Sequence, residues 1–182
     1  MYRPIKSLIF LVGLFVVVFL LMMPASGQSQ LTAASKVAID GIGSIRVGMT
    51  IQQAEASARI RLLSPGSKLG DCWYVKPQAE PRDVSFMVIG GQIARVDIYG
   101  NSRITTIRGA KIGDSEDRIK SLYPGQIRVT PHKYVQGGHY LTFVPRDASD
   151  RQYRIVFETD SRRVKHIRAG RLPEVEYVEG CA

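Results

Sequence analysis

Apolar residues recur at helical spacing from Ile51 to Ala58, directly after a polar residue that can start a helix. Thr50 precedes this stretch and Gln53 stands three positions later, which together form a capping-box pattern. The breaker Ser64-Pro65-Gly66 ends any helix that begins here. The small residues on its apolar side would let such a helix pack closely on a sheet.

A second, shorter helix is predicted after Ser115, with Ile119 and Leu122 on its inward side. Two acidic residues follow the cap, where they complement the positive end of the helix dipole. Pro124-Gly125 then ends the pattern, just as Pro-Gly ends the first one. The chain therefore contains two short helical patterns of the same design.

Two pairs of strand-like runs are each separated by a turn signal, which indicates two β-hairpins. The first joins Val84–Ile89 to Gln92–Tyr99 through Gly90-Gly91, and the second joins Tyr153–Glu158 to Arg163–Arg168. Further strand patterns cover Cys72–Val75, Ile104–Arg108 and His139–Val144.

The two halves of this pattern share short sequence signals in the same order. Arg46–Thr50 and Lys111–Ser115 share a basic–apolar–Gly–x–hydroxyl signal, 65 residues apart. In the hairpins the matching apolar positions lie 71 residues apart: Phe86 with Phe157, Ile93 with Val164 and Val96 with Ile167. We therefore expect an α+β fold of two tandem helix-plus-antiparallel-strand units, residues 41–108 and 109–171. Their strands would form one combined antiparallel sheet with the helices on one face.

Residues 1–27 have the composition of a targeting segment and are left out of the fold. Arg3 and Lys6 precede an apolar run from Ser7 to Met23, and Ala25-Ser26-Gly27 supplies the small residues of a cleavage site. An uncleaved inner-membrane anchor is the alternative. We expect an exported protein, periplasmic or secreted, with a flexible leader over residues 28–40.

The chain has two cysteines, Cys72 and Cys181, and an even pair in an exported chain indicates a disulfide. The bond would tie an extended C-terminal tail, residues 172–182, to a strand of the first half. Two free thiols or an intermolecular bridge are the alternatives. A redox-active pair would usually form a close C-x-x-C motif, which the sequence lacks.

The motifs Gly48-Met49-Thr50 and Gly113-Asp114-Ser115, with the order of elements over residues 41–170, resemble a known repeat architecture. It is similar to the tandem α/β repeat of the β-lactamase inhibitory protein family. More distantly, it resembles the small lipoprotein of the outer-membrane barrel-assembly machinery. The chain departs from both in having one candidate disulfide and no cysteine for a lipid anchor. The resemblance implies a binding scaffold, and neither family's specific activity is carried over. The chain also looks like uncharacterised exported bacterial proteins.

The formal net charge of +9 limits the classes of partner. Basic residues are interleaved with acidic ones, and the densest cluster is Arg162-Arg163-Val164-Lys165-His166. Nucleic acid is disfavoured because an exported protein seldom meets it. Weak attraction to anionic surfaces is the more consistent interpretation of the charge.

Three histidines, His132, His139 and His166, are the main candidates for chemistry. A small exported hydrolase that uses His132 or His139 is the alternative function that we considered. The sequence offers no Gly-x-Ser-x-Gly elbow and no ligand set that completes a metal site, so we assign no catalytic residue, metal or cofactor.

Alternation in the two hairpins predicts one apolar sheet face and one polar face. Ile93 is out of alternation with Val96, which indicates a β-bulge. Arginine and tyrosine dominate binding energy at interfaces, so the polar face is the candidate partner-binding surface. Its residues are Arg95, Asp97, Tyr99, Arg154 and Glu158. We expect a non-catalytic module that binds a protein partner in the cell envelope or outside the cell.

Overall fold

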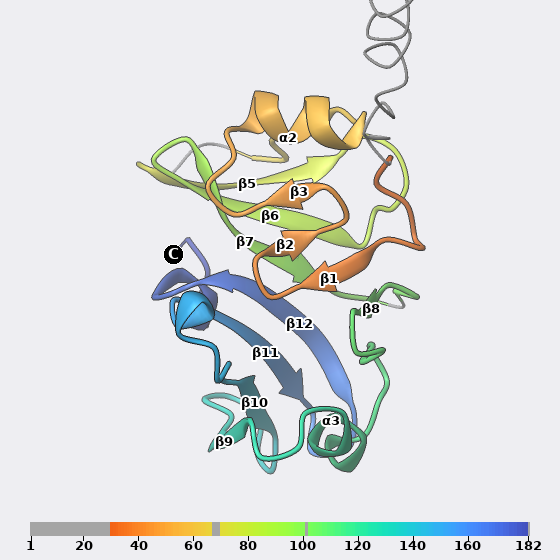
Figure 1. The fold of residues 1–182 in the computed structure, drawn as a ribbon, viewed down its shortest axis with the longest axis vertical. Helices are drawn as coiled ribbons and strands as arrows, with labels where there is room; N and C mark the ends of the chain where they lie inside the picture. The colour runs from red at the N-terminus through yellow and green to blue at the C-terminus, as the bar shows by residue number, and fades with distance from the viewer. Residues whose placement is uncertain (1–29, 67–69, 101, 182) are drawn as a thin grey trace, which may run out of the picture.

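A long, fully antiparallel sheet forms the body of the molecule (Figure 1). The computed structural model describes residues 30–66, 70–100 and 102–181, so the targeting segment 1–27 lies outside the described residues. In the order in which they pair, the eight strands are β4 (Leu62–Leu63), β5 (Cys72–Pro77), β6 (Val84–Ile89), β7 (Gln92–Ile98), β12 (Val164–Arg171), β11 (Tyr153–Thr159), β10 (His139–Phe143) and β9 (Ile127–Pro131).

The strand order is symmetric about the central pair, β7 and β12. On one side of this pair lie β6, β5 and β4, and on the other lie β11, β10 and β9. Asp97 of β7 stands opposite Arg168 of β12 at the midpoint. Both predicted hairpins are confirmed, and the expected bulge is present: the register shifts so that Ala94 is the extra residue. Lys165 is the extra residue at the corresponding position of the second hairpin.

The predicted fold class is wrong. We expected an α+β protein of two tandem helix-plus-strand units with one sheet and helices on one face. The described residues are instead 40% strand and only 14% helical, and they form two sheets. The second sheet has four short strands, β3 (Ile45–Arg46), β2 (Gly41–Ile42), β1 (Lys36–Ala38) and β8 (Thr105–Thr106). Strands β1 to β3 belong only to the N-terminal half, so the two halves are not equivalent units.

The described helices are short because each is stopped early. Helix α2 (Ile51–Ala58) ends at Arg59, which adopts a left-handed conformation with φ of 50°, well before Ser64. The capping box of Thr50 and Gln53 is confirmed at its start. Helix α3 (Glu116–Leu122) is capped by Ser115, as expected. Within the described residues, no helix is long and apolar enough to cross a membrane.

The repeated glycine signal has the same structural role in both places. The amide of Gly48 donates to the Ile93 carbonyl at 2.8 Å, and that of Gly113 donates to the Val164 carbonyl at 2.9 Å. Both glycines have φ near +90°, at 91° and 87°, a conformation that side-chain-bearing residues rarely adopt. The signal therefore attaches the start of each helix to the second strand of a hairpin.

A single large core fills one face of the sheet. Phe86, Phe157 and Leu141 are fully buried there, and Ala54 of α2 and Ile119 of α3 pack into the same cluster. The segment that we expected to be a flexible leader also contributes. Leu31 is 1% exposed, and its amide donates to the Ala58 carbonyl at 3.1 Å. The prediction of a flexible leader is therefore wrong for the described residues 30–40.

A smaller apolar cluster lies on the other face of the sheet, under the C-terminal segment. Val175 is fully buried between Tyr140 and Val156, with Leu172 and Val178 beside it. The segment contains one short 3-10 turn, η2 (Glu174–Glu176), instead of the extended tail that we predicted; another, η1 (Ala148–Asp150), precedes β11. The predicted disulfide between Cys72 and Cys181 is confirmed. We call residues 172–181 the strap.

Candidate functional site

Polar side chains at alternate positions of the central strands face away from the core, under and beside the strap. Arg95 and Asp97 come from β7, and His166 and Arg168 come from β12. Because successive residues of a strand point to opposite faces, the apolar residues between them enter the core. Tyr74 of β5 joins the set from two strands away.

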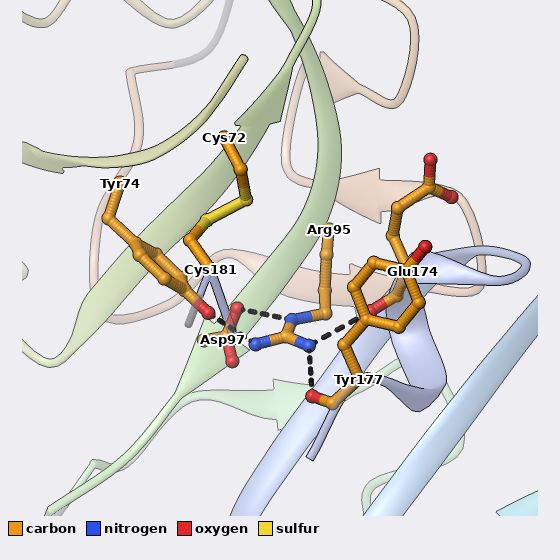
Figure 2. Close-up of a disulfide and its surroundings, with 7 residues drawn as sticks. All are labelled: Cys72, Tyr74, Arg95, Asp97, Glu174, Tyr177 and Cys181. Carbon is orange, nitrogen blue, oxygen red and sulfur yellow. Dashed lines mark hydrogen bonds and ion pairs between the residues drawn. A yellow bond between two sulfur atoms is a disulfide. The ribbon is translucent and has the colours of Figure 1, made fainter. Parts of the chain in front are cut away.

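Arg95 is the centre of this group, and its guanidinium is almost saturated with hydrogen bonds (Figure 2). Its Nε lies 2.9 Å from Asp97 Oδ2, and its Nη2 donates to the Tyr74 hydroxyl at 2.5 Å. Its Nη1 donates to two strap carbonyls, Glu174 O at 2.9 Å and Tyr177 O at 2.8 Å. Arg95 is 2% exposed and Asp97 is 3% exposed, so a buried ion pair holds the strap to the sheet.

Arg168 extends the network to the other half of the sheet. Its Nη1 donates to Tyr177 O at 2.9 Å, and its Nη2 lies 3.4 Å from Glu158 Oε2. Glu158 Oε1 in turn lies 2.9 Å from His132 Nε2. At the other end of the network, His166 Nε2 of β12 lies 3.0 Å from Asp97 Oδ1 of β7. The two central strands thus share one continuous set of charged contacts.

Burial and charge shift the pKa values within this network. The pKa of Arg168 is lowered by burial and then by the nearby charge of Arg95. Burial alone would raise the pKa of Asp97, but the hydrogen bond with His166 and the charge of Arg95 outweigh it and lower the pKa. Burial, followed by the charge of Asp97, raises the pKa of Tyr74 to about 12. The network therefore favours an ionised Asp97 and a neutral Tyr74.

The strap is acidic where the face beneath it is basic. Glu176 Oε1 lies 2.6 Å from Arg128 Nη2, and Glu179 Oε1 lies 2.7 Å from Lys133 Nζ. The Tyr134 hydroxyl also donates to Glu179. These contacts lower the pKa of Glu179, mainly through the hydrogen bond from Lys133.

An open cleft of about 430 Å³ lies beside the strap, on the side of β5 to β7. Its lining side chains from the sheet include Tyr74, Lys76, Ser85, Tyr99 and His166, and its floor includes Arg95 and Asp97. The Lys76 ammonium lies 5.0 Å from the centre of the Tyr99 ring, and the Tyr99 and His166 rings are 6.5 Å apart, edge to face. We refer to this space as the cleft.

The five residues predicted to form an exposed face are therefore divided. Arg95 and Asp97 are buried, and Arg95 is bonded to strap carbonyls, so the expected exposure of these two side chains is wrong. Tyr99 is half-buried at the cleft, and Glu158 is half-buried within the network. Arg154 lies apart, where its Nη1 donates to the carbonyls of Arg151 and Tyr153.

Sequence reasoning missed Tyr74, His166 and Arg168 as members of this group. Alternation along Arg163–Arg168 would have placed His166 and Arg168 on the same face. Their approach to Arg95 and Asp97 depends on the pairing of β7 with β12, which no local pattern encodes.

The histidines proposed for catalysis have structural partners. His132 Nδ1 accepts from the amides of Tyr134 and Val135, both at 3.0 Å, while its ring stacks on Tyr140 at 4.6 Å. These contacts fix the connection between β9 and β10. His139 Nδ1, at the start of β10, lies 2.8 Å from Glu116 Oε1, at the start of α3.

No contact described for these histidines indicates catalysis. In the described ranges, no group of three or more His, Cys, Asp or Glu residues is arranged to hold a metal ion. The site presents charged and aromatic side chains around open space, and the network beneath them holds them in place.

No protein-family model, no curated protein and no solved structure matches this chain. The resemblance to the β-lactamase inhibitory protein family therefore stays a prediction.

Proposed function

We propose that the protein is a non-catalytic binding module of an exported compartment and that it holds a protein partner at the cleft. The observation that carries this proposal is the arrangement of Lys76, Tyr99 and His166 around open space on a rigid sheet. Aromatic and cationic side chains in such positions are typical anchors of protein interfaces.

The floor of the cleft supports recognition because its polar groups are already paired. Asp97 is held by Arg95 and His166, and Tyr74 is held by Arg95. A partner would meet side chains of fixed geometry on β5, β7 and β12. Binding sites built on strands lose less conformational freedom when the partner docks than sites on loops.

The disulfide supports the exported part of the proposal, since such bonds persist in oxidising compartments. The mature chain isolated from that compartment is expected to begin at Gln28, by intact mass. A mass that includes residues 1–27 would favour the uncleaved anchor.

The test is site-specific crosslinking in cells that express the full chain. A photoreactive amino acid replaces Tyr99 in one variant and Ile107 in a matched control. Ile107 is suitable because it is 71% exposed and directly follows β8, which belongs to the other sheet. We expect a discrete crosslinked protein from position 99 only, and the additional change Lys76→Ala should reduce its yield. Equal products from both positions, or none from position 99, would contradict the proposal.

A further inference from the structure

The strap lies on the sheet as a bound peptide would, not as an added strand. Arg95 and Arg168 donate to its backbone carbonyls at Glu174 and Tyr177. Within the described part of the chain, no strand ladder includes the strap, and its apolar contacts form a cluster of their own under Val175. Side chains of the sheet therefore hold this segment, and one backbone hydrogen bond joins its first residue, from Leu172 N to Gln152 O at 2.8 Å.

Charge complementarity defines the chemistry of this selection. The strap carries Glu174, Glu176 and Glu179 and no basic residue. The groove beneath and beside it presents the cationic side chains of Arg95, Arg128, Lys133, Arg168 and Arg171. Arg95 and Arg168 also pair with Asp97 and Glu158 of the sheet, whereas Arg128, Lys133 and Arg171 pair with the glutamates of the strap. An acidic segment is thus the natural ligand for this groove.

The strap fills its groove incompletely. Val178 borders the cleft and two further cavities, of about 190 Å³ beside Arg128 and Tyr140 and about 760 Å³ beside the disulfide. Arg168 Nε, on the sheet, is buried without a hydrogen-bond partner among the described residues. Because an unpaired buried polar atom is costly, a ligand that accepts a hydrogen bond from Arg168 Nε would gain a contact that the strap does not make.

We propose that this groove is a binding site for an acidic peptide segment of a protein partner and that the strap occupies it in cis. The partner segment carries carboxylates separated by apolar residues, as Glu174 to Glu179 do. The Cys72–Cys181 bond keeps the strap at high effective concentration and so sets the affinity that a partner must exceed. This proposal shares with the proposed function only the premise that the protein binds other proteins.

The experiment uses the full chain with Cys181→Ser, which frees Cys72, and with Glu176→Lys and Glu179→Lys, which weaken occupation in cis. Both glutamates make surface ion pairs, so these two changes leave the core intact, and circular dichroism confirms that the variant without the disulfide is folded before the probe is added. The probe is a synthetic peptide with the sequence of residues 173–182, activated as a pyridyl disulfide. Attack by the Cys72 thiolate forms the mixed disulfide and releases pyridine-2-thione, whose absorbance gives the rate.

We expect this peptide to react about tenfold faster than the same peptide with lysine at its three glutamate positions, and the ratio to shrink at high salt. Both peptides are also allowed to react with free cysteine. A rate ratio no larger than the ratio for free cysteine overturns the proposal.

A second variant separates the groove from the general positive charge of the protein. Adding Arg128→Gln and Lys133→Gln should weaken or abolish the preference without restoring the ion pairs in cis, whereas an unchanged preference overturns the assignment. If the single variant Cys181→Ser forms dimers that Arg128→Gln and Lys133→Gln remove, the occupant is the strap of a second copy, and the partner assignment is wrong. Crosslinking from position 99 is measured on the oxidised protein, so failure of one test leaves the other standing.

Discussion

Arg95 is the side chain on which the outer face depends, because it joins the sheet, Tyr74 and the strap through one buried guanidinium. Its loss would leave Asp97 and Tyr74 with one fewer partner and would remove one of the donors to each of two strap carbonyls. A lysine could not replace it, since one ammonium cannot reach all four acceptors in the same plane.

Arg95→Ala is therefore expected to lower the free energy of unfolding by about 3–5 kcal/mol, as the removal of one partner from a buried ion pair does. Urea denaturation measures the change, and Arg95→Lys should recover only a small part of it. Arg82→Ala is the matched control, since its ion pair with Glu80 is exposed, and it should change stability by less than about 0.5 kcal/mol. A comparable loss in both alanine variants would contradict the role assigned to Arg95.

Tyr74 gives the network a signature at alkaline pH. Its folded pKa is about 12, above the ordinary value of 10.0, so the stability that it contributes is complete below pH 10 and is lost as the pH rises through 12. The absorbance of tyrosinate, compared between the wild type and Tyr74→Phe, isolates this one titration. We expect the difference curve to have its midpoint near pH 12. A midpoint near pH 10 would show that Tyr74 is not held as described.

At the scale of elements, the glycine signal shows how two short helices are attached to the sheet. Gly48 and Gly113 hold φ near +90° with no atom within 4 Å of an added Cβ, so an alanine there would strain only the backbone. Each glycine precedes its helix cap by two residues and donates to the neighbouring hairpin.

Gly48→Ala and Gly113→Ala should each destabilise the protein by about 1–3 kcal/mol, and by similar amounts. Gly66→Ala is the control, because Gly66 has open space around it and an ordinary φ, and it should be neutral or slightly stabilising. Thermal unfolding of the three variants provides the comparison. A harmless change at Gly113 with a harmful one at Gly48 would show that the two signals do different work.

The sequence predicted those elements whose signals are local. Thr50 with Gln53 marked α2, Gly90-Gly91 marked the first hairpin, and the misplaced Ile93 marked its bulge. It did not predict β1 to β3, because Gly41-Ile42-Gly43 offers too few residues for a strand pattern and these strands exist only through mutual pairing. Neither could it predict that the strap buries Arg95, since that contact spans 79 residues.

At the scale of the whole molecule, the disulfide is the only covalent cross-link among the described residues. It joins residues 109 positions apart and so restricts most of the unfolded chain. In the chain-entropy model a loop of this length is worth about 4–5 kcal/mol.

Unfolding in the presence of a reductant is thus expected to occur at lower denaturant concentration, with a loss of up to about 4–5 kcal/mol. The double variant Cys72→Ser and Cys181→Ser should show the same loss and no further response to the reductant. Equal stability of the reduced and oxidised protein would mean that the strap's side-chain contacts alone close the fold.

The position of the strap at the C-terminal side of all the described strands has a consequence for the order of assembly. Synthesis proceeds from the N-terminus, so Arg95 and Asp97 leave the ribosome about eighty residues before the carbonyls that cover them. For that interval Arg95 lacks the strap carbonyls and Cys72 lacks its disulfide partner, while the rest of the groove is still being made. The strap can therefore close over the sheet only after β12, the last strand, has been made, and the disulfide can form only after that.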